Sequence, residues 1–64
     1  MSHFSTVWLE NVQPGDFIEL PNGDCVDVAI VTELGDGKIE VTGRDMRTGV
    51  IGPADMEVRI VRRG

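Results

Sequence analysis

The sequence predicts an all-β domain of short antiparallel strands, and three features of the 64-residue chain support this prediction. Glycine and proline recur along the chain, and the roughly five to eleven residues between them are too few for a series of helices. Within these segments apolar and polar residues alternate with the period of two that is typical of strands. Hydrophobic residues make up 41% of the chain, enough for one small core. Residues 1–64 are therefore expected to form a single domain.

The alternation defines the expected strands and the faces that they bury. The strands are predicted over residues 16–20, 25–33, 38–43, 50–51 and 57–62. The side chains expected to face the core are Ile18, Leu20, Val26, Val28, Ile30, Ile39, Val41, Val58 and Ile60.

Turn residues connect these strands. Pro21 followed by Asn22 and Gly23 fits a turn, because proline presets φ and Asn-Gly tolerates positive φ. The Asp36-Gly37 pair between alternating apolar residues is a strong hairpin signal. The strands on either side of it are therefore expected to form a central antiparallel hairpin. A further hairpin loop is expected between Gly43 and Gly49.

The connection to the last strand, residues 52–56, contains Pro53. Pro53 cannot lie in a central strand because it has no N–H to donate to a ladder. Proline followed by Ala-Asp-Met fits one turn of 3₁₀ helix before the last strand.

The two ends of the chain are less regular. Residues 6–9 fit either an opening strand, which we favour, or the start of a turn into residues 10–13. Residues 1–5 and 62–64 are expected to be flexible. The longest apolar run is residues 28–31 and no basic segment precedes an apolar one, so the sequence predicts no signal peptide, no membrane span and a cytoplasmic location.

Five short strands with one 3₁₀ turn before the last resemble an SH3-like small barrel, in which the sheet closes on itself and leaves no long edge. The stretch from Asn11 to Leu20 resembles the x-x-L-x-P-G-D-x-I-x-L opening of KOW segments and of short uncharacterised proteins of actinobacteria and their phages, with Val12 where leucine is usual. The resemblance implies a five-stranded antiparallel SH3-like barrel. It implies little about function, because Pro-Gly-Asp before a strand recurs in unrelated barrels.

No catalytic residue, metal site or cofactor is predicted. One cysteine and one histidine exclude a disulfide framework and leave too few ligands for structural zinc. Asp16 is interpreted as a turn residue, with Pro14 presetting φ, Gly15 adopting positive φ and the carboxylate bonding nearby N–H groups. Cys25 is expected to be an inert, partly exposed thiol. General acid–base catalysis needs groups held in a concave pocket, for which so small a chain has little room, so an enzyme is not expected.

The net charge of −5 is unevenly distributed along the chain. Residues 1–40 hold eight acids and one lysine, whereas residues 41–64 hold five arginines and three acids. The arginines suit contacts to phosphate, so a KOW-like nucleic-acid or ribosome-associated module is one hypothesis. The other interpretation is a set of cross-strand salt bridges to the acidic half. The acidic half also suggests a third hypothesis, a nucleic-acid mimic that binds a basic protein.

The favoured prediction is a non-enzymatic protein–protein interaction module of a small bacterial or phage protein, of which self-association is one form. Simple alternation points several apolar side chains away from the core, and such a surface patch usually marks a partner site. Burial through bending of a long strand is the rival explanation. The predicted partner-binding surface consists of Phe17, Ala29, Val31 and Val61 with a rim of Arg44, Arg47 and Arg59.

Overall fold

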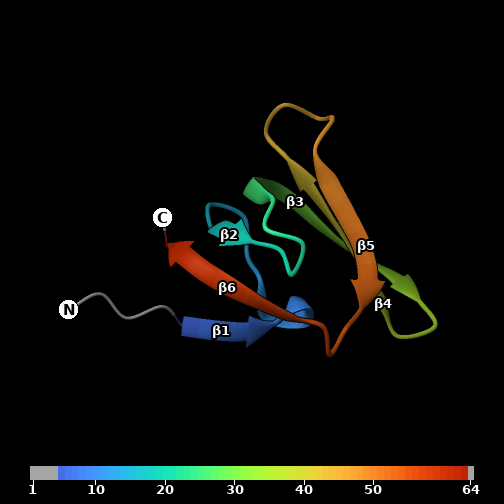
Figure 1. Ribbon diagram of the computed structural model, residues 1–64. Coiled ribbons are helices and arrows are strands. Elements are labelled where there is room, and N and C mark those ends of the chain that lie inside the picture. The colour runs from blue at the N-terminus through green and yellow to red at the C-terminus, as the bar shows by residue number, and fades with distance from the viewer. Residues whose placement is uncertain (1–4, 64) are drawn as a thin grey trace.

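Six antiparallel strands form one sheet in the computed structural model, which describes residues 5–63 (Figure 1). They are β1 (Ser5–Trp8), β2 (Phe17–Glu19), β3 (Cys25–Gly35), β4 (Lys38–Gly43), β5 (Gly49–Pro53) and β6 (Glu57–Arg62). Their order across the sheet is β1-β6-β2-β3-β4-β5, and the sheet is not closed because its two end strands do not pair with each other. The all-β prediction is confirmed, the count of five strands is wrong, and a closed barrel is not observed.

The additional strand is the opening one. Strand β1 pairs with β6 and places Val7 opposite Val58, which confirms the favoured strand over residues 6–8, whereas Leu9 already belongs to the following turn. The chain then turns through the 3₁₀ helix η1 (Leu9–Asn11), whose first N–H donates to the carbonyl oxygen of Met56 at 2.8 Å. This hydrogen bond ties η1 to the residue that precedes β6.

The 3₁₀ turn expected over residues 52–56 is not formed there. Gly52 and Pro53 belong to β5, and the N–H of Met56 donates to the carbonyl oxygen of Pro53 at 2.9 Å, which closes a single turn. Pro53 is tolerated within a strand because β5 lies at the end of the sheet, where a missing N–H interrupts no ladder.

The long strand β3 contains a bulge at Ala29 that reverses the predicted faces of its second half. Val28 lies opposite Gly43, whereas Ile30 lies opposite Thr42, so one residue of β3 has no counterpart in β4. An extra residue moves every later side chain to the other face. Ile30, predicted to be buried, is therefore 43% exposed, and Val31 packs against the core.

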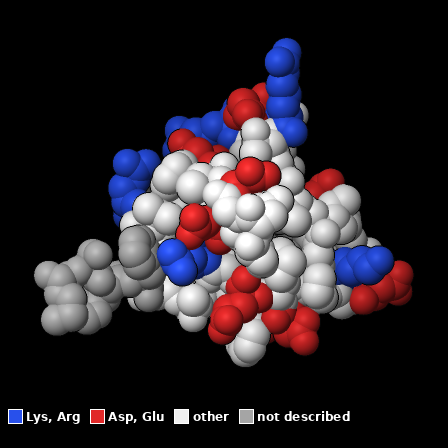
Figure 2. Space-filling model, viewed as in Figure 1, with Lys and Arg blue, Asp and Glu red and all other residues white. Residues whose placement is uncertain are grey.

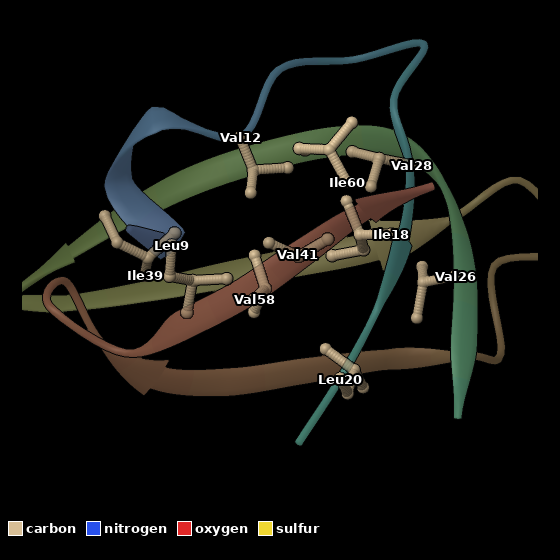
Figure 3. Close-up of a cluster of buried hydrophobic side chains, with 10 residues drawn as sticks. All are labelled: Leu9, Val12, Ile18, Leu20, Val26, Val28, Ile39, Val41, Val58 and Ile60. Atoms are coloured by element: carbon tan, nitrogen blue, oxygen red, sulfur yellow. The ribbon is translucent and has the colours of Figure 1, made fainter. Parts of the chain in front are cut away.

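The core lies between the two halves of the bent sheet and beneath η1 (Figure 3). Its ten buried apolar residues are Leu9, Val12, Ile18, Leu20, Val26, Val28, Ile39, Val41, Val58 and Ile60. Eight of the nine predicted core residues are among them, and Ile30 is the exception. Burying a side chain of this size stabilises the fold by about 1.5–3 kcal/mol, so a few of these residues dominate the stability of so small a domain.

The chain ends were expected to be flexible over residues 1–5 and 62–64. Residues 1–4 and 64 lie outside the described residues, so the prediction stays untested for them. Ser5 pairs with Ile60 at the start of β1, and Arg62 pairs with Phe17 at the end of β6. Arg63 follows β6 and makes an ion pair with a buried aspartate.

Candidate protein-interaction surface

Phe17 and Arg44, two residues of the predicted surface, meet at the outer face of β2 and β3. Phe17 is the cross-strand partner of Asp27 on one side and of Arg62 on the other, and cross-strand partners share a face. The Arg62 guanidinium lies 5.6 Å from the centre of the Phe17 ring, within the range of a cation–π contact. Nε of Arg44 lies 3.3 Å from an Asp27 carboxylate oxygen. Phe17 therefore contacts Arg62, which was not predicted, and Arg44 is joined to this face through Asp27.

Arg59 lies on the same outer face, opposite Glu19, which follows Phe17 by two residues along β2. Its Nη1 is 3.1 Å from Oε1 of Glu19, its cross-strand partner in β2. Because Arg59 and Arg44 both pair with carboxylates from the acidic half of the chain, the salt-bridge interpretation of the charge asymmetry gains support. The Lys and Arg side chains in the view of Figure 2 also form several separate groups interspersed with Asp and Glu.

The remaining predicted residues lie elsewhere. Val31 is opposite Val41 and packs against the core, and Ala29 is the half-buried bulge residue of β3. Val61 is 41% exposed at a second irregularity, where β6 gains one residue over β2. Arg47 lies in the loop between β4 and β5 and is exposed. The structure therefore brings Phe17, Arg44 and Arg59 to one face, and this face does not include the inward-packing Val31.

A different apolar surface forms on the outer side of β3, β4 and β5. Ile30 lies beside Thr42, and Ile51, 57% exposed, lies beside Glu40 in the next outward-facing row. Met46, 64% exposed, lines an open depression of about 310 Å³ together with Thr42 and Ile51. We call Ile30, Met46 and Ile51 the β5 face. The sequence did not predict this face, because Ile30 was assigned to the core and neither Val50 nor Ile51 was assigned to the solvent-facing side of its strand.

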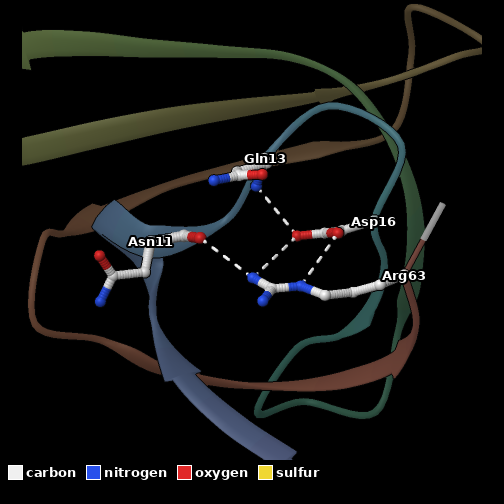
Figure 4. Close-up of polar contacts among 4 residues, drawn as sticks. All are labelled: Asn11, Gln13, Asp16 and Arg63. Atoms are coloured by element: carbon white, nitrogen blue, oxygen red, sulfur yellow. Dashed lines mark hydrogen bonds and ion pairs between the residues drawn. The ribbon is translucent and has the colours of Figure 1, made fainter.

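Asp16 is buried, and its surroundings fit the interpretation as a turn residue (Figure 4). Gly15 has φ 98°, and one carboxylate oxygen of Asp16 accepts the N–H of Gln13 at 3.0 Å. Nε of Arg63 lies 3.3 Å from the other oxygen, and Nη2 of Arg63 also donates to the carbonyl oxygen of Asn11 at 3.3 Å. Asp16 thus joins the turn at its own position to the residue that follows β6, which is a structural role.

The loop between β4 and β5 is organised by the carboxylate of Asp45. This carboxylate accepts the N–H of Arg47 at 3.0 Å, the N–H of Thr48 at 2.9 Å and the hydroxyl of Thr48 at 2.6 Å. The hydroxyl bond and the two backbone bonds stabilise the charged form and lower the pKa of Asp45 from 3.8 to about 2. The loop holds Met46 beside β5 through these bonds.

The lowered pKa of Asp45 predicts how this loop responds to acid. Because the pKa is lowered in the fold, the stabilisation is complete above about pH 4 and is lost as the pH falls through about 2. The amide chemical shifts of Arg47 and Thr48 should titrate together with a midpoint near pH 2, and Asp45→Asn should abolish this titration. A shared midpoint at 3.8 or above would show that the three hydrogen bonds do not form in solution.

Metal-ligating residue types and the cysteine were also located in the described part of the chain. No group of three or more His, Cys, Asp or Glu side chains within residues 5–63 could hold a metal ion. Cys25 is an exposed free thiol in β3. No helix of the described part of the chain is long and apolar enough to cross a membrane. Comparison with family profiles, with curated proteins and with solved structures finds no match to this chain.

Proposed function

We propose that the chain is a non-enzymatic protein–protein interaction module with an SH3-like arrangement of strands. The proposal for the fold is supported by β3, which pairs with β2 through Cys25–Asp27 and with β4 from Val28 onward. One bent strand shared by two halves of a sheet is the feature expected of such a small barrel. The gap between β1 and β5 is where closure would be required.

The observation that carries the functional proposal is the β5 face. Six large apolar side chains are exposed within residues 5–63, and three of them, Ile30, Met46 and Ile51, lie on or beside the outer side of β3–β5. A fourth, Leu34, belongs to the β3–β4 hairpin. Clustered exposed apolar residues on a small domain usually mark a contact surface. We therefore place the partner-binding surface on the β5 face rather than around Phe17.

The nucleic-acid hypothesis has less support. Binding to phosphate requires clustered cations that are available to displace counterions. Arg44, Arg59 and Arg63 instead make ion pairs with carboxylates of the same chain. The mimic hypothesis loses ground for the same reason, because three acids of the N-terminal half are engaged in these pairs.

Affinity capture with matched variants tests the proposal. Wild type, Ile51→Lys and Val61→Lys are used as baits in extract of the native cell, since the two substitutions put the same charge on exposed apolar sites of different faces. A protein retained by wild type and Val61→Lys but lost with Ile51→Lys supports the β5 face as a binding surface. Retention of the same protein by all three baits, or of nucleic acid in place of protein, contradicts it.

A further inference from the structure

Strand β5 presents a free row of backbone groups. The N–H of Gly43 donates to Thr48 O at 2.7 Å, and the N–H of Ala54 donates to Gly37 O at 2.7 Å, so these residues bound the β4–β5 ladder. Hydrogen-bonded pairs alternate along an antiparallel ladder. The alternation directs the backbone N–H and C=O groups of Gly49 and Ile51, and the C=O of Pro53, away from β4. No described strand lies on that side of β5.

This edge has little of the protection that free edges usually carry. Natural edge strands are guarded by charged side chains, proline or bulges. Strand β5 has no charged residue, its pairing with β4 is regular, and its one guard, Pro53, is at its end. Ile51 at its centre is 57% exposed. The other free edge is β1. Its outward-facing residues Thr6 and Trp8 lie opposite the charged residues Arg59 and Glu57 of β6.

We propose that a second copy of this chain pairs its β5 with this β5 in antiparallel fashion, about a two-fold axis at Ile51. The inference rests on the proposed function and names a partner for the Ile51 end of the β5 face. In this register the N–H of Ile51 donates to Ile51 O of the second copy, and the N–H of Gly49 donates to Pro53 O. With their symmetry mates these make four hydrogen bonds. The missing N–H of Pro53 removes one potential donor from each Gly49–Pro53 pair.

Side-chain contacts favour the same register. Cross-strand partners share a face, so Ile51 packs against Ile51 of the second copy, and β-branched pairs of this kind stabilise a sheet. Each isoleucine, 57% exposed in the single chain, thereby loses part of its contact with water. The two copies would form one continuous sheet across β4-β5-β5-β4.

Charge favours the antiparallel orientation. It brings the loop that precedes β5 in one copy, which carries Arg47, near the turn that follows β5 in the other copy, which carries Asp55. Within residues 5–63, neither Arg47 nor Asp55 has an ion pair inside its own chain. A shift that pairs Gly49 with Ile51 keeps four hydrogen bonds but sets each Ile51 opposite a glycine, so the contact between the two isoleucines is lost. The Ile51-centred dimer is therefore preferred.

Sedimentation equilibrium of the purified full chain tests this proposal. Wild type should pass from monomer to dimer as its concentration rises from about 10 μM to about 1 mM, the behaviour of a small interface. Ile51→Lys should raise the midpoint concentration at least about tenfold, because each dimer loses two buried isoleucines. Val61→Lys should change it less than about twofold, because this site lies outside the interface.

Charge reversal tests the antiparallel orientation of the two copies. Arg47→Glu alone should weaken the dimer, and adding Asp55→Arg should restore it, because the opposite-charge pair is rebuilt with its signs exchanged. A wild type that stays monomeric throughout, or a dimer unaffected by Ile51→Lys, overturns the proposal. Failure of the double variant to regain affinity overturns the antiparallel orientation, in which Arg47 lies near Asp55 of the second copy. The two proposals can fail separately. If wild type is monomeric but captures a different protein, and Ile51→Lys abolishes this capture, the proposed interaction module is supported and only the second copy is excluded as its partner.

Discussion

Leu9→Ala is expected to remove most of the stability of this protein. Leu9 is fully buried at the start of η1, and its side chain packs beside Gly52 of β5. It therefore bridges the N-terminal segment and the far end of the sheet, which do not pair through strands. Leucine-to-alanine changes in a core cost about 2–5 kcal/mol, whereas a domain of this size has a total stability of only about 3–10 kcal/mol.

Urea unfolding monitored by circular dichroism measures this effect, with Leu34→Ala as the matched control. Leu34 is 45% exposed in the β3–β4 hairpin, so its truncation should change the free energy of unfolding by less than about 0.5 kcal/mol. Similar losses in the two variants would show that η1 does not close the core as described.

Asp16→Ala is expected to cost about 1–3 kcal/mol, the second largest effect. The substitution leaves the N–H of Gln13 without its acceptor and removes the ion pair with Arg63. The Arg63 guanidinium is about half exposed, so the ion pair itself contributes a minor part, and most of the loss comes from the buried carboxylate and its backbone bond.

A double-mutant cycle separates these contributions. Arg63→Ala and the Asp16→Ala/Arg63→Ala double variant complete the cycle. The sum of the losses of unfolding free energy in the two single variants should exceed the loss in the double variant, because the two residues interact. Glu33→Ala is the control, an exposed glutamate that makes no ion pair within residues 5–63, and it should be nearly neutral. Strictly additive losses would contradict the contact between Asp16 and Arg63.

Local patterns predicted the local parts of this fold. The Asp36-Gly37 turn joins β3 and β4 as expected, with φ 56° and 72° at its two residues. The turn at Pro14-Gly15-Asp16 has the predicted positive φ at glycine and the predicted carboxylate bond. Each of these features depends on residues within three or four positions of one another, so the sequence alone specifies them.

The sequence did not predict features that depend on distant strands. The bulge at Ala29 is defined by the register with β4, and the irregularity near Val61 by the register with β2. Simple alternation cannot detect an inserted residue, and one insertion exchanges the two faces of a strand. For that reason the predicted surface included the inward-packing Val31 and missed Ile30. The contact between Asp16 and Arg63, 47 residues apart, was missed for the same reason.

An NMR dilution series tests the central claim, that the edge of β5 pairs with β5 of a second copy, most directly. Amide shifts of the ¹⁵N-labelled protein are followed from about 1 mM to about 10 μM. We expect concentration-dependent shifts to concentrate at the amides of Gly49 and Ile51, with those of Thr6 and Trp8 in β1 unchanged, because only the β5 edge gains hydrogen bonds. Shifts confined to β1 or to the residues around Phe17 on β2, or spectra that do not change with concentration, would contradict this claim.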